Sequence, residues 1–242
     1  MSAAAAHHHY VVADHPEGGL RLNLAGVEIV CRPTGGLWLE AWRALIVADL
    51  HFEKGSSFAA RGQLLPPYDT RETLRRLEAE VTALAPRILV FLGDTFHDRG
   101  GEARLARDDR ERIDALARGR TLVWVAGNHD AEGPCDLAGE TAAHLSIGGL
   151  DLAHAPSEGP VLGEVAGHLH PCARVRALGA SVRRRCFVTD GERLILPAFG
   201  AFAGGLNVRD RAFGPLMNRP PLAAVLGAGR VHAVGWASLR PD

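Results

Sequence analysis

Lysine is almost missing from this chain of 242 residues, because its 27 basic residues are 26 arginines and the single Lys54. Net charge is also small, since 28 acidic residues bring the formal charge to -1. A chain with so little net charge has no overall field that attracts nucleic acid or an anionic membrane. Contact with a polyanion must therefore depend on a local patch.

Long apolar runs and paired cysteines are absent as well. No window approaches the roughly 18 consecutive apolar residues that a membrane helix needs, and the first residues lack the basic and apolar regions of a secretion signal. The cysteines are far apart with no C-x-x-C pair, which argues against a zinc knuckle or a disulfide scaffold; they are Cys31, Cys135, Cys172 and Cys186. We expect a cytoplasmic protein with no membrane association.

Apolar residues are plentiful at 47%, enough for one large core. We expect a single domain over residues 20–242. Residues 1–19 have a run of alanines, the triplet His7-His8-His9 and no periodic apolar pattern, which predicts a flexible arm. Imidazoles bind many divalent ions, but a mobile triplet rarely forms a specific site, so we assign it no chemistry.

The first half of the chain alternates between short apolar strands and amphipathic helices. We expect strands at residues 26–31, 43–48, 87–92 and 121–126. A first helix is expected from an N-cap at Asp69 or Thr70 to Pro86, and a second from Asp108 or Asp109 to Arg118. The second half predicts a β-rich sheet beside this unit, with strands at 150–153, 164–166, 186–189, 193–196 and 230–234. The apolar segment 220–229 packs either on the core or on another subunit.

Five short segments place metal-ligating residue types directly after strand-like runs. They are Asp49-Leu50-His51, Gly93-Asp94, Gly127-Asn128-His129-Asp130, His154 and Gly167-His168-Leu169-His170. Open α/β sheets form their sites in the crevice beyond the carboxyl ends of the strands. Two divalent ions about 3.5–4 Å apart can clamp a phosphoryl group, activate a water and stabilise the leaving oxygen. The segments therefore indicate a two-metal phosphoesterase site.

In this order, the segments resemble the motifs of the calcineurin-like metallophosphoesterases, from D-x-H to G-H-x-H, over about residues 43–171. The resemblance implies an α/β fold, a four-layer α/β/β/α sandwich of two mixed β-sheets flanked by helices. A closer similarity extends over residues 48–62, Leu65-Pro66-Pro67 and residues 92–98. It is to the bacterial ligase-associated phosphoesterases, which are encoded beside a DNA ligase and a helicase and are thought to act in DNA end repair.

The resemblance also implies roles for the ligand residues. One ion would be held by Asp49, His51 and His170, the other by Asn128, His154 and His168, and Asp94 would bridge the two. Because the set contains nitrogen and oxygen ligands and no cysteine, we expect two divalent ions, manganese first, with iron or zinc as alternatives.

His129 follows a ligand and is not needed as one, so we expect it to face the substrate and to assist departure of the leaving oxygen. In many relatives a carboxylate three residues after the bridging Asp orients this imidazole. Here that position is His97, with Asp98 one residue later, which puts the usual Asp–His pair in doubt. His97 is then an additional candidate for contact with the substrate.

Further candidates for contact with the substrate are Lys54, Arg61 and Arg99, with a surface role as the alternative for each. The run of Arg183, Arg184 and Arg185 is either a solvated turn or a contact to a nucleic-acid backbone. We expect a dinuclear metal-dependent phosphodiesterase acting on DNA or RNA ends or on small phosphodiesters. A functional association with a DNA ligase and a helicase follows from the resemblance, and a homodimer stays open. The alternatives are a phosphomonoesterase with the same metal ligands and a non-catalytic protein-binding scaffold.

Overall fold

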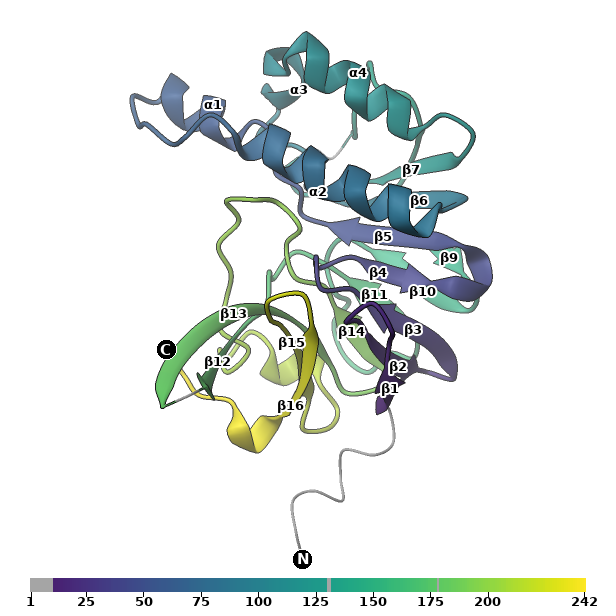
Figure 1. Cartoon of the computed structure of the whole chain (residues 1–242), viewed down its shortest axis with the longest axis vertical. Helices are drawn as coiled ribbons and strands as arrows, with labels where there is room; N and C mark the ends of the chain where they lie inside the picture. The colour runs from purple at the N-terminus through teal and green to yellow at the C-terminus, as the bar shows by residue number, and fades with distance from the viewer. Residues whose placement is uncertain (1–10, 130–131, 178) are drawn as a thin grey trace, which may run out of the picture.

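Two β-sheets pack face to face, and α-helices cover the outer face of one of them (Figure 1). The computed structural model describes residues 11–129, 132–177 and 179–242. The histidine triplet at residues 7–9 and Asp130 of the third ligand segment lie outside the described residues. The predicted α/β sandwich of two mixed sheets is confirmed.

The first sheet has eight strands, in the order in which they follow one another along the chain. Neighbours are antiparallel from β1 to β5 and parallel from β5 to β8. Because β5, β6 and β7 run in the same direction, their carboxyl ends meet at one edge. The strands are β1 (Val11–Asp14), β2 (Leu20–Leu24), β3 (Val27–Cys31), β4 (Leu37–Leu39), β5 (Ala44–Ala48), β6 (Ile88–Leu92), β7 (Thr121–Val125) and β8 (Glu140–Ala142).

The second sheet has the order β16-β15-β13-β14-β11-β10-β9, and β12 pairs with β13 outside this path. The pairs β10–β11 and β11–β14 are parallel and the other pairs are antiparallel. The strands are β9 (Leu145–Ile147), β10 (Leu150–Ala153), β11 (Glu164–Ala166), β12 (Cys172–Ala177), β13 (Ala180–Thr189), β14 (Arg193–Ile195), β15 (Leu222–Leu226) and β16 (Val231–Gly235).

Strand β5 shows how the layers are built. All five of its residues are buried. Ala44, Ile46 and Ala48 pack in the core between the two sheets, whereas Leu45 and Val47 pack against the helices. Successive side chains of a strand point to opposite faces, so a strand covered on both faces reads as an unbroken apolar run.

The helices are α1 (Lys54–Ala60), α2 (Asp69–Leu84), α3 (Gly101–Arg104) and α4 (Arg107–Leu116). The two predicted helices are confirmed as α2 and α4, but the predicted N-cap of α2 is wrong. Tyr68 occupies that position without a side-chain hydrogen bond. Asp69 and Thr70 instead accept the backbone N–H groups of Gly55 and Glu53, at 3.1 and 2.9 Å. They therefore tie α2 to the start of α1.

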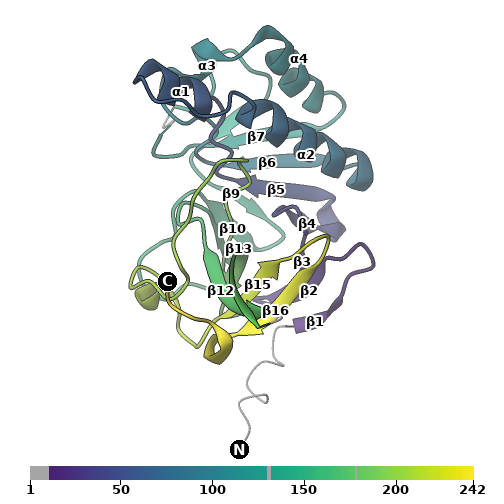
Figure 2. The ribbon, with the colours of Figure 1, turned by 60° about the vertical axis from the view of Figure 1, so that its left-hand side comes forward.

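The outer face of the second sheet has a different cover. Its apolar side chains pack against loops and two short 3-10 helices, η3 (Gly214–Leu216) and η4 (Trp236–Ser238), while a third, η2 (Glu40–Trp42), precedes β5. Among the described residues, no α-helix lies in this layer. Figure 2 shows α1 to α4 at one end of the molecule and β12, β13, β15 and β16 at the other.

Most predicted strands agree with the structure to within one residue at either end. The exception is β13, which begins at Ala180 and not at Cys186. The apolar segment at 220–229 packs on the core, because Leu222, Ala224 and Leu226 of β15 are buried between the sheets.

Residues 11–19 of the predicted arm belong to the folded part of the chain. Within residues 11–19, Val11–Asp14 form β1, which pairs with β2, and the N–H of Gly18 donates to the carbonyl of His15 at 3.0 Å. Among the described residues, no helix is both long enough and apolar enough to cross a membrane.

Candidate metal centre

The predicted ligand segments all follow the carboxyl ends of strands. Asp49 follows β5, Asp94 follows β6 and Asn128 follows β7 in the first sheet. His154 follows β10 and His168 follows β11 in the second sheet. The facing sheets therefore bring together side chains from distant parts of the chain, and these form two groups.

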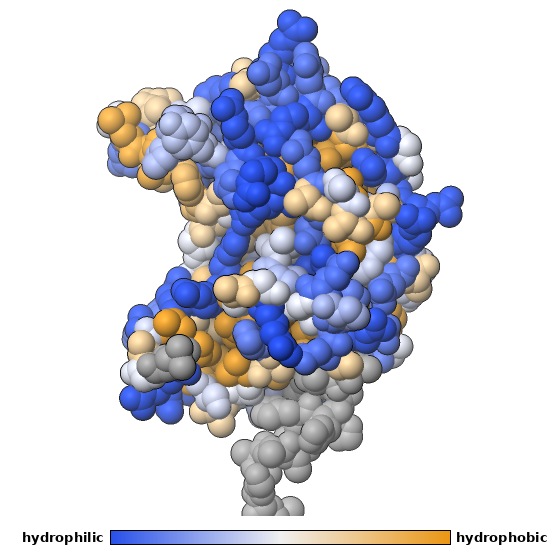
Figure 3. Space-filling view, viewed as in Figure 1, coloured by the Kyte–Doolittle hydropathy of each residue, from blue (hydrophilic) through white to orange (hydrophobic). Residues whose placement is uncertain are grey.

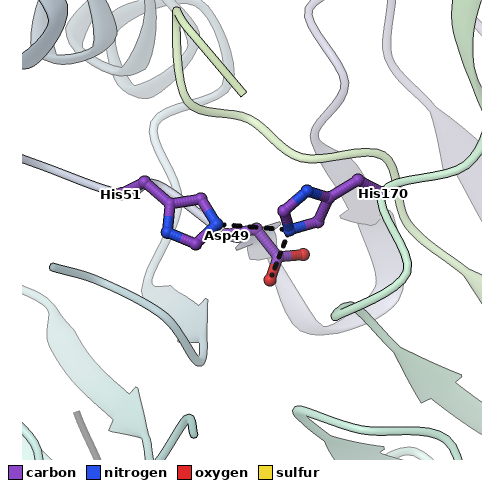
Figure 4. Close-up of side chains that lie close together, drawn as sticks. All are labelled: Asp49, His51 and His170. Carbon is purple, nitrogen blue, oxygen red and sulfur yellow. Dashed lines mark hydrogen bonds and ion pairs between the residues drawn. The ribbon is translucent and has the colours of Figure 1, made fainter. Parts of the chain in front are cut away.

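The first group consists of Asp49, His51 and His170 (Figure 4). The Nε2 atoms of His51 and His170 are 3.2 Å apart. The Nε2 atom of His170 lies 3.3 Å from Oδ1 of Asp49, whose side chain is fully buried. Two imidazoles and one carboxylate thus converge within reach of a single ion.

The second group consists of Asp94, His154 and His168. Nε2 of His154 is 3.1 Å from Nδ1 of His168 and 3.4 Å from Oδ1 of Asp94. The amide oxygen of Asn128 lies 2.8 Å from the same nitrogen, so this residue joins the group. The two groups meet where Oδ1 of Asp49 is 3.7 Å from Nδ1 of His154. The carboxylate of Asp94 lies within the second group.

The backbone of these segments is strained where the ligands occur. Nine non-glycine residues of the described chain have positive φ, and five of them are predicted ligands: Asp49, His51, Asp94, His168 and His170. A left-handed backbone costs an L-residue about 1–2 kcal/mol, and such strain is concentrated at functional sites. Backbone hydrogen bonds stabilise this strained conformation. The N–H of His168 donates to Oδ2 of Asp49 at 2.9 Å, and the N–H of His129 donates to Oδ1 of Asp94 at 3.0 Å.

The donor atoms suit divalent cations. Burial, helped by the nearby His170, His129, His97 and Lys54, lowers the pKa of His51 to about 2, so its ring is neutral and keeps a lone pair. Burial also lowers the pKa of His168. Ring nitrogens face each other in both groups, at 3.2 and 3.1 Å, and two lone pairs at such distances repel unless a cation or a shared proton lies between them. A nitrogen and oxygen set without sulfur fits manganese, iron or zinc.

His129 lies beside the second group and is held by a peptide carbonyl. Its Nδ1 is 2.9 Å from the backbone oxygen of His97, to which it donates. Its Nε2 lies 3.8 Å from Oδ2 of Asp94, and 40% of its side chain is exposed. Asp98 is paired instead with Arg104 at 2.8 Å. The carbonyl of His97 therefore takes the place of the orienting carboxylate.

The four residues predicted to contact the substrate lie in different surroundings. The ring of His97 stacks on that of His129 with centroids 5.8 Å apart, and burial and Lys54 lower its pKa. Lys54 donates to the carbonyl of Phe202 at 3.0 Å, which ties α1 to the loop before Leu206. Arg61 is exposed at the end of α1. Arg99 is also exposed and lines a separate hollow of about 270 Å³.

Three glycines that sequence reasoning left without a role support the ligands. A Cβ atom on Gly93 would lie 2.2 Å from Nδ1 of His154, and one on Gly167 would lie 2.7 Å from Oδ2 of Asp49. A Cβ atom on Gly205 would lie 2.0 Å from the carbonyl oxygen of His170. Two of these glycines directly precede a ligand in the sequence, which is the signal that could have identified them. The carbonyl of His97 leaves no such signal, because every residue has one.

Comparison with known proteins gives two kinds of match. The family model described as calcineurin-like phosphoesterase matches residues 43–172. Among solved structures, the nuclease MPE of Pseudomonas putida aligns with a TM-score of 0.68 and 25% identity, covering 89% of this chain and 100% of that chain. YfcE, a phosphoesterase from E. coli, aligns with a TM-score of 0.38 and 16% identity, covering 79% and 97%. No curated protein sequence matches the chain.

Proposed function

The chain belongs to the calcineurin-like phosphoesterase family and is a metal-dependent phosphoesterase, and we propose that it hydrolyses phosphodiesters at a dinuclear metal centre. The observation that carries this proposal is the pair of ligand groups at one edge of the sandwich. Asp49, His51 and His170 would hold one ion. Asn128, His154 and His168 would hold the other, with Asp94 as the bridge.

Two divalent ions held in this way would polarise phosphoryl oxygens, neutralise developing charge and lower the pKa of an attacking water. The protein's own contribution is to fix the donors. Burial keeps the ring of His51 neutral, and the N–H of His168 holds the carboxylate of Asp49 in place. The nitrogen and oxygen donor set supports manganese as the ion, with iron or zinc as the alternatives.

His129 is the proposed general acid. Because its Nδ1 donates to the carbonyl of His97, its Nε2 is the atom left to face the substrate. When the ring is protonated, Nε2 can give its proton to the oxygen that leaves phosphorus. The stacked ring of His97 and the ammonium of Lys54 are proposed to contact the substrate beside it. Arg61 and Arg99 are weaker candidates for the same role, being exposed.

The similarity to the P. putida nuclease extends along the whole of the nuclease chain, and it supports a diester substrate over a monoester. We therefore propose a nucleic-acid phosphodiester, cut at an end or internally as by an endonuclease. A setting in DNA repair beside a DNA ligase and a helicase, homodimer formation and a cytoplasmic location stay predictions.

Turnover of matched aryl phosphate esters tests this function. Protein stripped with a chelator is restored separately with Mn²⁺, Zn²⁺ and Mg²⁺ and assayed with an aryl phosphodiester and the corresponding monoester. Metal-dependent turnover that favours the diester supports the proposal. Preference for the monoester favours the phosphomonoesterase, and folded protein that binds no metal and turns over neither ester favours the scaffold.

A further inference from the structure

The β12–β13 hairpin carries a concentrated positive charge close to the metal centre. Residues 172–189 contain five arginines and no acidic residue, in a chain whose formal charge is -1. β12 begins at Cys172, two residues after His170. The hairpin is therefore a direct continuation of a ligand segment.

The strand register places four of the arginines on one face. Arg174 lies directly opposite Arg183, and Cys172 lies opposite Arg185. Opposite residues of an antiparallel pair share a face, and alternate residues along a strand return to it. Arg174, Arg176, Arg183 and Arg185 therefore share a face, which we call the arginine face. On the other face, Ala173 and Val175 pack on the core of the second sheet.

The arginine face is poorly neutralised. Its carboxylate partner among the described residues is Asp242, which lies 3.3 Å from Arg174 and 3.2 Å from Arg183. Arg176 is exposed. Like charges directly opposite each other across two strands destabilise the pairing, so this arrangement costs stability. A sequence that keeps such a cost is best explained by a ligand that supplies the missing negative charge.

Position links the arginine face to the metal centre. Arg183 donates to the carbonyl of Gly205, and Gly205 packs against the carbonyl of His170. Arg185 donates to the carbonyl of Ala198 in the loop that crosses the end of β5. At a rise of about 3.3 Å per residue, the side chain of Arg176 starts no more than about 20 Å along the strand from His170.

The shape of the molecule agrees with this position. In Figure 3 the outline is hollowed between the end that carries α1 and the end that carries the hairpin, and in Figure 1 the arrowhead of β5 points to the same side. The ligand segment that follows β5 thus lies on the side of the hollow, and the hairpin forms one of its walls.

We propose that the arginine face is the binding track for the phosphodiester backbone of a nucleic-acid strand that enters the metal centre. This inference rests on the proposed function, because it concerns the part of the substrate that lies outside the reacting diester. Guanidinium groups pair with phosphates in a two-pronged geometry, and contacts to phosphate position a strand without reading its sequence. An acidic protein fits less well as the ligand. The track ends at the metal centre, and such a protein carries no phosphodiester that could be hydrolysed there.

The test removes two charges that do not contact the loops of the metal centre. Arg174→Gln/Arg176→Gln is compared with the α4 variant, Arg107→Gln/Arg118→Gln, which removes the first residue of α4 and an arginine two residues after its end. Arg107 matches Arg174 in being paired with one carboxylate, since it lies 2.9 Å from Glu111. Binding of labelled single strands of DNA and RNA, 20 nucleotides long, is measured by fluorescence anisotropy over a range of salt concentrations. The full chain is loaded with Mn²⁺ and carries His129→Ala so that the strands stay intact.

Loss of two phosphate contacts should reduce the slope of log K against log salt by about 1.4 and weaken binding roughly tenfold at 0.1 M salt. The α4 variant should bind like the parent, and Arg174→Lys/Arg176→Lys should recover most of the affinity. Equal losses with DNA and RNA identify the shared backbone as the ligand, and a loss with one alone assigns the track to that nucleic acid.

The proposal is overturned if both glutamine variants bind like the parent or weaken equally. It is also overturned if the hairpin variant loses affinity for polyglutamate and not for either nucleic acid. Turnover of the aryl phosphodiester by the unaltered protein is measured in parallel. Failure of that turnover in the unaltered protein would contradict the proposed function and leave the binding result to stand separately.

Discussion

Nδ1 of His129 lies 2.9 Å from the backbone carbonyl oxygen of His97, so a peptide group orients the imidazole that we propose as the general acid. This contact does not depend on the side chain at position 97. The orientation of His129 and the proposed substrate contact of the His97 side chain can therefore be separated by mutation.

His129→Ala should lower kcat for an aryl phosphodiester by about 10²–10⁴-fold, the range typical of a lost general acid. His97→Ala keeps the carbonyl, so kcat should fall much less while KM rises. Both variants should retain their metal, measured by mass spectrometry of the metal content. A kcat for His97→Ala as low as that of His129→Ala would contradict the backbone orientation.

Asp94→Ala should release both ions, because the carboxylate is the proposed bridge and also accepts the N–H of His129. The matched control is Asp98→Ala, which removes a nearby carboxylate paired with Arg104. Metal content per chain and far-UV circular dichroism are measured for both. Unchanged metal in folded Asp94→Ala protein would refute the bridging role.

The stability of the metal-free protein should fall in acid because of His51. The folded pKa of about 2 lies below the unfolded value of 6.5, since burial, helped by the nearby histidines and Lys54, disfavours the charged ring. The unfolded chain therefore binds a proton that the folded chain does not, and stability is present above pH 6.5 and is lost as the pH falls below it. At pH 5 the loss from this group is about 2 kcal/mol.

Urea unfolding of chelator-treated protein at pH 7.5 and pH 5 measures this difference. In His51→Gln, which has no titrating ring at this position, the difference should shrink by about the same 2 kcal/mol. An undiminished difference in the variant would show that other groups cause the acid sensitivity.

Gly93→Ala should displace His154 and empty the second ligand group. A Cβ atom there would lie 2.2 Å from Nδ1 of His154, in addition to the strain of a φ of +74°. Gly119→Ala is the control, with a φ of +71° and no atom within 4 Å of the new Cβ. Both should lose about 1–2 kcal/mol from backbone strain, but only Gly93→Ala should lose metal. Equal metal content in the two variants would contradict the steric argument.

The parts of the fold that were predicted from sequence are those with a strong local pattern. The apolar run of residues 44–48 predicts β5, because both faces of that strand are buried. The spacing of Leu74, Leu77 and Val81 predicts α2, because one face of that helix is buried. The predicted ligand segments stand out in the sequence because each follows the carboxyl end of a strand.

Other parts depend on contacts between distant segments. The first half of β13 was missed because most of Ala180 to Arg185 is exposed and shows no alternation of buried and exposed side chains. Helix α1 was missed because its seven residues have no apolar stripe and are fixed by Asp69 and Thr70. The replacement of a carboxylate by the carbonyl of His97 depends on how two loops meet, which no local pattern records.

The measurement that tests the dinuclear centre most directly is a titration of chelator-stripped protein with Mn²⁺, followed by turnover of an aryl phosphodiester. Two ligand groups that act together predict turnover that rises to its maximum at two equivalents of Mn²⁺ per chain. Turnover that is complete at one equivalent, or that persists without any divalent ion, would contradict a catalytic centre built from both groups.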